Sequence, residues 1–434
     1  MTGGPISAPR ALVVAFGEEL LEGRVLDTNS RMISRELLSL GYLVGRHVTL
    51  GDAPGALRAL LDEVAGDYRV VVTTGGLGPT ADDRVREEVA ALAGAPLVAV
   101  EGAVEPLVRL WQRYRGGEPP AFYLKQAFVP QGAQPLENRA GTAWGFACRI
   151  PGDRQILCLP GPPGEARSAL LDGGGSALLA ASIRSGERLA FEVFHTSGEP
   201  ESAIEPRVRD LLEDSRNPRF GIIASRMGVS VSAMAYPEPG GRTAQEVLAA
   251  ASRELIRRLG PLCFGRGEDT PATVVLAALE ERNATLACAE SCTGGRLAAA
   301  LTAVPGCSGV FEGGWVCYAN AAKERDLGVS ADLLQRFGAV SAEVALAMAE
   351  GARARAGTDW AVATTGVAGP GGGTPAKPVG TIWIGLAGPA KRGAILRRAY
   401  ARAGRASVQE QGVGDALEAL RREILGHPSL PDRA

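Results

Sequence analysis

Histidine, lysine and aromatic residues are scarce in this sequence of 434 residues. It contains 3 histidines and four lysines, and its aromatic content is 5%. The histidines are His47, His195 and His427, and the lysines are Lys125, Lys323, Lys377 and Lys391. Because arginine stays protonated in proteins whereas lysine can lose its proton, a lysine kept in an arginine-rich chain points to a specific role.

The sequence also lacks the features of membrane, secreted and nucleic-acid-binding proteins. No apolar run is long enough to span a bilayer, and residues 1–9 show no signal-peptide pattern. A formal net charge of -2 gives no basic field for a nucleic acid. The 7 cysteines are scattered without paired zinc-like spacing, which favours reduced thiols. We therefore predict a cytoplasmic protein, and we expect neither a membrane nor a nucleic acid as its partner.

Chain length and the alternation of strand and helix patterns predict three domains of mainly α/β structure. We place them at residues 1–170, 171–265 and 270–425, with the middle one a small α+β domain. In the first domain, buried strands at Leu12–Phe16 and Val70–Thr74 alternate with helices, which predicts a mostly parallel sheet covered on both faces. Ligands of such sheets bind beyond the carboxyl ends of the strands.

The loop after the second of these strands suits a phosphate and a metal ion. Gly75, Gly76 and Gly78 allow backbone N–H groups to approach a phosphate closely. Asp82 and Asp83, just beyond them, can hold a divalent cation. The loop matches neither a Walker loop nor the dinucleotide fingerprint. The alternative is a Gly-rich turn in which Asp82 caps a helix and Asp83 lies near the helix dipole.

Three further polar residues lie near predicted strand ends in the first domain. Asn29 begins a helix that we expect to end at Gly41, with Asn29 or Ser30 as its cap. Asn138 and Glu165 lie in loops at strand ends, where each could reach a ligand.

The middle domain shows no group of residues typical of a catalytic site. Strands are expected at Leu189–His195 and Val229–Tyr236, and helices at Pro200–Leu212 and Thr243–Leu259. His195 is interpreted as an edge-strand residue rather than a ligand. We predict that this domain is a spacer or a dimerisation element, and that the protein is a homodimer.

A strand, a hydroxyl-rich turn and a helix follow one another in the last domain. The apolar run Ala284–Cys288 predicts a buried strand, Ser291 lies in the turn, and Arg296–Ala303 predicts a helix. Exposed N–H groups and the positive end of the helix dipole meet in such a turn and favour an anion. The alternative is an ordinary turn in which a Ser or Thr caps the helix.

The last domain contains no histidine, which excludes a Ser-His-Asp arrangement within it. If Ser291 is a nucleophile, the local bases are lysines, and Lys323 follows one strand, predicted at Trp315–Tyr318, and one turn. Lysine acts as a general base when burial or nearby positive charge lowers its pKa. The alternative is a surface lysine paired with Glu324 or Asp326.

Seven motifs together resemble the CinA family, the competence/damage-inducible proteins, over nearly the whole chain. They are Gly17–Leu21, Thr73–Asp83, Asn138–Gly145, Leu159–Glu165, Ala289–Gly295, Tyr318–Lys323 and Thr365–Gly373. The resemblance implies a first domain like the molybdopterin-binding α/β fold of MoaB and MogA, a KH-type α+β middle domain and a C-terminal α/β amidohydrolase domain.

The resemblance also implies two hydrolase activities of pyridine-nucleotide metabolism. The first domain would hydrolyse ADP-ribose to AMP and ribose 5-phosphate with a divalent metal (Mg, Mn or Co). The last domain would deamidate nicotinamide mononucleotide to nicotinate mononucleotide and ammonia without a cofactor.

The family motifs assign expected roles to individual residues. In the last domain, Ser291 is the nucleophile, Lys323 the base, Tyr318 a supporting phenol and Thr365 a second hydroxyl. Its expected substrate contacts are Thr293, Gly294 and Gly295, near whose N–H groups the oxyanion would lie, and Arg405, which would grip the phosphate. The expected substrate contacts of the first domain are Gly75, Gly76, Gly78, Thr80, Asn29, Asn138 and Glu165, and its expected metal ligands are Asp82, Asp83 and Glu18.

Three positions depart from the family pattern. The chain has Glu18 where the family usually has Asp, and Trp144 where it usually has Pro. Near the C-terminus the family tends to show two arginines, of which Arg405 matches the first while Gln409 stands at the second. The expected consequences are altered metal or ribose contacts at Glu18 and weaker phosphate binding at Gln409.

Two other functions compete with this bifunctional hydrolase. In the first, the N-terminal domain binds a nucleotide without cleaving it, as a sensor would. In the second, the chain is an accessory protein in DNA uptake or repair with one or both sites inactive. The middle domain lacks an evident Gly-x-x-Gly clamp with basic flanks, which disfavours the second function.

Overall fold

The computed structural model describes residues 8–64, 66–184, 186–214, 216–225, 228–389, 395–400 and 404–429, with residues 395–399 described by their backbone. The chain divides into two compact units. The first comprises the residues up to Phe191 together with Arg216–Pro218 and Met234–Ala250, and the second comprises the remainder. None of the helices in the described ranges is both long and apolar enough to cross a bilayer.

A six-stranded sheet forms the centre of the N-terminal domain. In sheet order its strands are β2 (Leu43–Leu50), β1 (Arg10–Phe16), β3 (Val70–Thr74), β8 (Arg154–Leu159), β7 (Gly145–Ile150) and β6 (Gln134–Leu136). The first four are parallel to one another. Strand β7 runs antiparallel to β8, and β6 runs antiparallel to β7. The mostly parallel sheet predicted from the sequence is confirmed.

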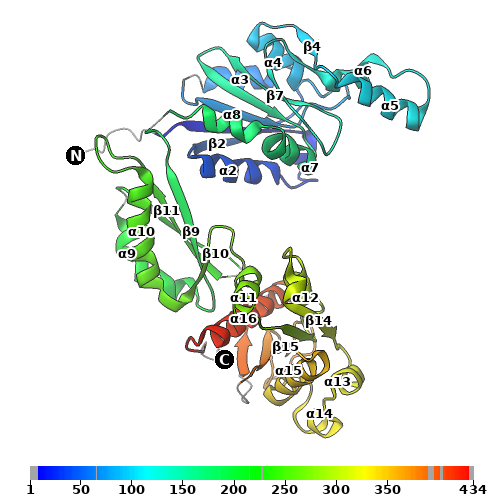
Figure 1. Cartoon of the computed structure of the whole chain (residues 1–434), viewed down its shortest axis with the longest axis vertical. Helices are drawn as coiled ribbons and strands as arrows, with labels where there is room; N and C mark the ends of the chain where they lie inside the picture. Colours follow the sequence, from blue (N-terminus) through cyan, green and yellow to red (C-terminus); the bar gives the residue numbers. More distant parts are fainter. Residues whose placement is uncertain are drawn as a thin grey trace. The chain divides into compact units, whose positions relative to one another are not determined.

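Helices cover both faces of this sheet, because alternate residues of each strand point to opposite sides. Leu12 and Val14 of β1 pack with α3 (Ala56–Glu63) and α4 (Val85–Ala93). The other face packs against α2 (Asn29–Leu40), α7 (Pro163–Arg167) and α8 (Gly175–Ala181), and Figure 1 shows the two helix layers. The domain also contains α1 (Glu18–Leu21), β4 (Leu97–Ala99), α5 (Val104–Arg115), α6 (Ala121–Leu124) and β5 (Phe128–Pro130).

The middle of the chain forms a four-stranded sheet with two helices. In sheet order the strands are β10 (Arg219–Ser225), β11 (Gly228–Ala235), β9 (Ala190–Thr196) and β12 (Cys263–Arg266), and the helices are α9 (Glu201–Glu213) and α10 (Ala244–Leu259). The interpretation of His195 as an edge-strand residue is wrong, because the short strand β12 pairs with the second edge of β9.

A five-stranded sheet forms the centre of the C-terminal domain. In sheet order its strands are β14 (Phe311–Val316), β13 (Leu286–Glu290), β15 (Trp360–Gly366), β16 (Thr381–Ala387) and β17 (Ile395–Ala399). The first three are parallel to one another. Strand β16 runs antiparallel to β15, and β17 runs antiparallel to β16. The carboxyl ends of β14, β13 and β15 therefore lie at one edge.

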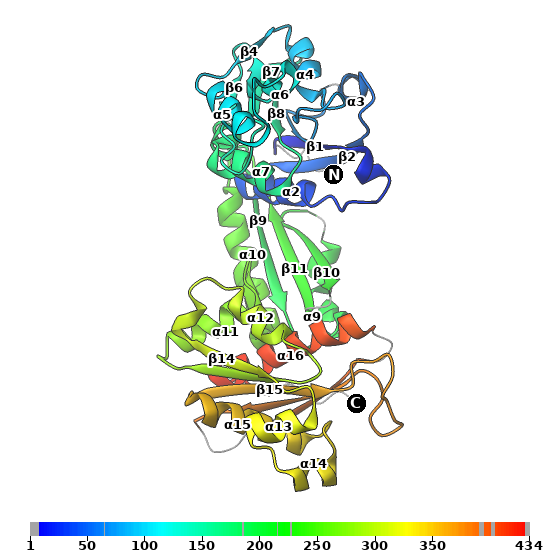
Figure 2. The same cartoon turned by 90° about the vertical axis from the view of Figure 1, so that its right-hand side faces the viewer.

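Two helix layers enclose this sheet. Cys288 and Val362 pack against α11 (Pro271–Glu280), α12 (Arg296–Thr302) and α16 (Arg405–Leu425). Ala287 and Ala289 pack against α13 (Asn320–Leu327), α14 (Ala331–Phe337) and α15 (Ala342–Ala356). Figure 2 shows α16 and α15 on opposite sides of β15. Consecutive residues of β13 thus face different helix layers.

The position of β14 differs from the predicted strand Trp315–Tyr318. The strand ends at Val316, and Tyr318 lies beyond it. Gly313 and Gly314, which precede the predicted strand, lie inside β14. A Cβ at Gly314 would lie 2.6 Å from Cys288 Sγ, so a glycine there permits the close approach of β14 and β13.

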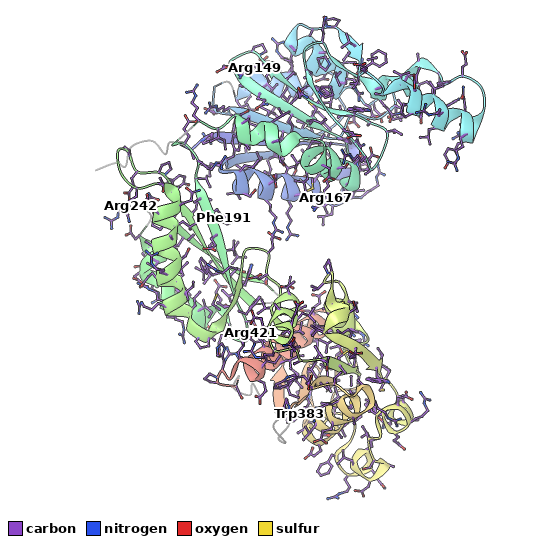
Figure 3. The ribbon with its side chains drawn as sticks, in the orientation of Figure 1. Arg149, Arg167, Phe191, Arg242, Trp383 and Arg421 are labelled. Carbon is purple, nitrogen blue, oxygen red and sulfur yellow. The ribbon has the colours of Figure 1, made fainter. Side chains whose placement is uncertain are left out.

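A buried ionic cluster holds the long helix α16. Glu418 is fully buried and accepts hydrogen bonds from Arg421 Nε at 2.8 Å and from Arg422 Nε at 2.6 Å. Arg421, labelled in Figure 3, also donates to the Pro261 carbonyl at 2.7 Å. A buried carboxylate needs such partners. The cluster holds the helix whose N-terminal half carries Arg405 and Gln409.

Gly351 in α15 permits α13, which carries Lys323, to pack closely. A Cβ at Gly351 would lie 2.1 Å from the Leu327 carbonyl oxygen. We expect Gly351→Ala to lower the melting temperature by about 2–6 °C, because overpacking costs about 1–3 kcal/mol and outweighs the gain of about 1 kcal/mol in helix propensity. Thermal unfolding of the full chain measures this. Gly309→Ala is the control, since its Cβ would meet nothing within 4 Å. A higher melting temperature for Gly351→Ala would contradict the packing argument.

Candidate active site

Ser291 and Lys323 meet at the carboxyl edge of the C-terminal sheet. Ser291 directly follows β13, and its N–H donates to the Thr364 carbonyl at 2.9 Å. Lys323 Nζ lies 3.1 Å from Ser291 Oγ and donates to the carbonyls of Cys317 at 2.8 Å and Tyr318 at 3.3 Å. The structure thus brings together the two residues that the sequence predicted as nucleophile and base.

Lys323 is buried, with 1% of its surface exposed. The alternative of a surface lysine paired with Glu324 or Asp326 is wrong, because Asp326 pairs with Arg325 at 2.6 Å and the Lys323 ammonium points into the protein. Burial lowers the pKa of Lys323 below its ordinary 10.5, since an ammonium loses hydration there. A lysine with a lowered pKa is a better proton acceptor near neutral pH.

The N-terminus of α12 is occupied by a carboxylate of the protein. Glu290 is fully buried and accepts from the N–H groups of Gly295 at 2.9 Å, Leu297 at 3.1 Å and Ala298 at 2.8 Å. The predicted anion site at this helix end is therefore filled by Glu290. The helix has no Ser or Thr side-chain cap either, so that alternative is also wrong.

Some main-chain N–H groups after Ser291 already have a hydrogen-bond acceptor in the protein, and others do not. Gly295 N–H is bound by Glu290, and Gly294 N–H donates to the Ser291 carbonyl at 3.3 Å. Within the described ranges, Thr293 N–H has no hydrogen-bond acceptor. Of the three residues predicted to hold the oxyanion, Thr293 is therefore the one with a free N–H group.

The two threonine hydroxyls of the site bind protein atoms. Thr293 is fully buried, and its Oγ1 lies 2.7 Å from Thr364 Oγ1. Thr365 is 1% exposed and donates from Oγ1 to the Ala339 carbonyl at 2.7 Å. The Thr365 hydroxyl hydrogen is thus directed at the main chain, and its oxygen retains acceptor capacity.

Arg405 and Tyr318 contact each other at the same sheet edge. Arg405 Nη2 donates to the Tyr318 hydroxyl at 3.0 Å, and its Nη1 donates to the Gly369 carbonyl at 2.7 Å. Tyr318 is 61% exposed. The guanidinium is therefore held between the loops that follow β14 and β15, and the phenol keeps its own hydrogen available for donation.

Sequence analysis missed the structural roles of Glu290 and Gln409. Glu290 is the last residue of a buried strand and directly precedes Ser291. A carboxylate at the end of an apolar strand needs hydrogen-bond donors, and this was the available signal for its role. Gln409 Nε2 donates to the Cys292 carbonyl at 2.8 Å, and its side chain is 5% exposed. The sequence offered no signal for this contact, which joins residues 117 positions apart.

The Gly75 loop of the N-terminal domain is tightly packed. A Cβ at Gly75 would lie 2.5 Å from the Phe16 carbonyl oxygen, and one at Gly78 would lie 2.5 Å from Asp83 Oδ2. Asp83 Oδ2 accepts from the N–H and hydroxyl of Thr80. Lys125 Nζ donates to the carbonyls of Thr80 and Asp83 at 2.7 Å each. Thr80 therefore holds one carboxylate oxygen of Asp83 within the loop, and the role of Asp83 as a metal ligand stays a prediction.

Helix α4 begins after this loop without a carboxylate cap. Its N-cap is Arg84, and no side chain caps it. The alternative in which Asp82 caps a helix is therefore wrong.

A carboxylate that sequence analysis missed lies near Asp82. Burial raises the pKa of Asp52, and the charges of Asp82, Glu18 and Glu19 raise it further. Asp52 N–H donates to Glu18 Oε1 at 3.2 Å. Within the described residues no three His, Cys, Asp or Glu side chains form a ready ligand set. The position of Asp52, two residues after strand β2, was the available signal.

Hydrogen bonds fix the position of the Asn29 side chain. Asn29 is 8% exposed and donates to Thr74 Oγ1 at 2.9 Å and to the Gly161 carbonyl at 2.7 Å. It does not cap α2, whose Ser30 N–H is bound by Asp27 at 2.9 Å. Its Oδ1 has no partner in the described part of the chain.

Asn138 and Glu165, each predicted to reach a ligand, contact each other. Asn138 Nδ2 donates to Glu165 Oε2 and to the Ala143 carbonyl at 3.0 Å. Asn138 Oδ1 accepts from Ala140 N–H at 3.0 Å. The side chain is therefore held rigidly beside the Glu165 carboxylate.

Comparison with known families and proteins covers both ends of the chain. Residues 12–173 match the family model of a probable molybdopterin binding domain, and residues 268–424 match that of a CinA C-terminal domain. A CinA-like protein of Synechococcus sp. (strain CC9902) is 41% identical over 419 residues, 95% of this chain and 98% of that protein. A CinA-like protein of Anaeromyxobacter dehalogenans (strain 2CP-C) is 42% identical over 412 residues, 94% and 98% of the two chains.

A solved structure is similar to part of the chain. The competence/damage inducible protein CihA from Agrobacterium tumefaciens is 40% identical, covering 34% of this chain and 90% of its own, with a TM-score of 0.34.

Proposed function

The chain belongs to the CinA family, and on that premise we propose that its C-terminal domain deamidates nicotinamide mononucleotide. The products are nicotinate mononucleotide and ammonia. The observation that carries the proposal is the contact between Ser291 Oγ and the buried Lys323 Nζ at 3.1 Å. A hydroxyl beside a desolvated amine, in a domain without histidine, is the arrangement of a Ser/Lys hydrolase.

Acylation uses both residues. Ser291 Oγ attacks the carboxamide carbon while neutral Lys323 Nζ accepts the hydroxyl proton. When the tetrahedral intermediate collapses, its C–N bond breaks and the Lys323 ammonium gives the proton to the leaving nitrogen, which departs as ammonia. An ester joins Ser291 to the pyridine carbonyl.

Deacylation reverses these roles with water. Lys323 accepts a proton from water as the water oxygen attacks the ester carbon, and the Ser291 C–O bond then breaks. The Lys323 ammonium returns a proton to Ser291 Oγ, and the carboxylic acid product leaves as the carboxylate after it loses its remaining proton to solvent. The two carbonyls that accept from Lys323, those of Cys317 and Tyr318, keep its nitrogen in place through both steps.

Recognition of the mononucleotide rests on Arg405. Two of the five N–H donors of a guanidinium are used by Gly369 and Tyr318, and the remaining donors suit a phosphate. The positive pyridinium ring would lower the Lys323 pKa further, because like charges disfavour the ammonium. The substrate thus favours the neutral form of its own base.

Substitution of the Ser291–Lys323 pair tests this mechanism. We expect Ser291→Ala and Lys323→Ala each to lower kcat by about 10³-fold or more, and the double variant little further, because the pair acts as a unit. Lys323→Arg should be nearly as inactive as Lys323→Ala, since arginine keeps the charge but cannot accept the proton. Ammonia release from nicotinamide mononucleotide measures all four.

The matched control is Lys377→Arg. Lys377 also donates to a main-chain carbonyl, that of Phe337, at 2.8 Å, and we expect this variant to keep the wild-type kcat. An active Lys323→Arg enzyme would contradict the role of Lys323 as base.

We also propose that the N-terminal domain hydrolyses ADP-ribose with a divalent cation. The supporting observation is a group of carboxylates in which Asp52 N–H donates to Glu18 Oε1 at 3.2 Å. Burial raises the pKa of Asp52, the charges of Asp82 and Glu18 raise it further, and a cation would relieve that repulsion. These carboxylates would hold the ion, in keeping with Mg²⁺ sites that use one or two carboxylates together with substrate phosphates. When bound, the cation neutralises charge on the diphosphate.

Asp52→Asn tests this second activity by stability and by turnover. Because the pKa of Asp52 is raised, its ionisation at neutral pH opposes folding, so we expect the variant to melt higher than wild type without metal at pH 7. Mg²⁺ or Mn²⁺ should raise the melting temperature of wild type and leave the variant unshifted.

Cleavage of ADP-ribose should require added metal and be lost in Asp52→Asn. Asp62→Asn, at an exposed aspartate paired with Arg58, is the control and should behave as wild type. An identical metal shift in Asp52→Asn would remove this cluster from consideration, and binding of ADP-ribose without cleavage would favour the nucleotide-sensor alternative.

The KH-type middle domain, the homodimer and the cytoplasmic location stay predictions from the sequence. The alternative of an accessory protein in DNA uptake or repair predicts salt-dependent binding of nucleic acid.

A further inference from the structure

The peptide group between Cys292 and Thr293 is held by a side chain from another element. Its carbonyl accepts a hydrogen bond from Gln409 Nε2 at 2.8 Å. Gln409 belongs to α16, lies one helical turn after Arg405, and is 5% exposed. This contact fixes one end of the peptide group that follows the nucleophile.

The direction of the Thr293 N–H follows from that contact. In a trans peptide the C=O and the N–H of the next residue point in opposite directions. A Cys292 carbonyl directed at Gln409 therefore turns the Thr293 N–H away from that side chain. The Thr293 side chain adds a second restraint through its hydroxyl contact with Thr364 at 2.7 Å.

Three of the neighbouring N–H groups are bound, whereas Cys292 N–H, like that of Thr293, has no acceptor among the described residues. Ser291 N–H donates to Thr364 and Gly294 N–H to Ser291, while Gly295 N–H donates to the buried Glu290 carboxylate. Thr293 N–H is without an acceptor in the described part of the chain. Serine hydrolases commonly bind the oxygen of the tetrahedral intermediate with two main-chain N–H groups, one of them on the residue after the nucleophile. In this turn that residue is Cys292, and Thr293 N–H is the next donor along the chain.

We propose that Gln409 is a positioning residue for the amidase, which holds the Cys292–Thr293 peptide so that Thr293 N–H is preorganised to donate to the oxyanion formed on Ser291. The proposal rests on the deamidase function proposed above. It replaces the expectation that Gln409 is a weakened phosphate ligand. Its amide nitrogen is bound to the main chain, and its burial leaves little surface for a phosphate.

Gln409→Met tests the proposal, because methionine keeps the size of the side chain and removes the donor. We expect kcat for nicotinamide mononucleotide to fall about 10- to 100-fold, since an oxyanion donor that is misaligned loses part of its effect in the transition state. KM should stay within about twofold, because ground-state binding does not use this contact. Gln409→Glu, which presents an acceptor to the Cys292 carbonyl, should be at least as slow at neutral pH.

A second measurement reports on the peptide itself. Amide hydrogen exchange of the segment 291–295 should be faster in Gln409→Met than in wild type. Gln411→Met is the matched control on the same helix, because Gln411 Nε2 donates to Ser407 Oγ at 2.8 Å and, within the described ranges, has no hydrogen bond to the Ser291 turn. We expect that variant to match wild type in kcat, in KM and in exchange.

The outcomes separate this inference from the proposed function. A wild-type chain that does not deamidate the nucleotide would overturn both. Given an active wild type, an unchanged kcat in Gln409→Met would overturn the positioning role alone. A raised KM with an unchanged kcat would show that Gln409 binds substrate, and unchanged exchange of 291–295 would show that it does not hold the peptide.

Discussion

A single buried amine constrains the C-terminal domain. Lys323 loses almost all its hydration and is held by two main-chain carbonyls and the Ser291 hydroxyl, and no carboxylate in the described part of the chain is a hydrogen-bond partner. An unpaired buried ammonium is unfavourable, so the domain must supply well-placed acceptors and close packing to keep it there. Gly351, which admits α13 against α15, is one part of that packing.

The alternation of side chains at the end of β13 separates this amine from the nearest buried carboxylate. Glu290 is bound by the N–H groups of α12 on one face, while Ser291 contacts Lys323 on the other. A carboxylate beside Lys323 would stabilise the ammonium and raise its pKa, which would weaken it as a base. The helix end that the sequence suggested for an anionic ligand therefore serves to hold the Glu290 charge away from the catalytic pair.

Local patterns in the sequence predicted the mostly parallel sheet of the N-terminal domain, and the family resemblance predicted the Ser291–Lys323 pair. Strand and helix alternation predicts a mostly parallel sheet, and the absence of histidine leaves lysine as the base. Contacts made across the fold were not accessible. Gln409 reaches Cys292 from a helix 117 positions away, and Asp52 approaches Asp82 only once β2 and the Gly75 loop are placed. The strand predicted at Trp315–Tyr318 begins earlier, at Phe311, and includes Gly313 and Gly314, because glycine occurs in close strand packing as well as in turns.

The titration of Lys323 is the most direct measurement of the central claim. The chain has only four lysines, so a protein labelled with 15N at the lysine Nζ gives few signals, and the Lys323→Arg variant identifies the one of interest. The account predicts that this signal titrates below 10.5, the ordinary lysine value, in the free enzyme. A Lys323 signal that titrates at or above 10.5 would contradict its role as the base that activates Ser291.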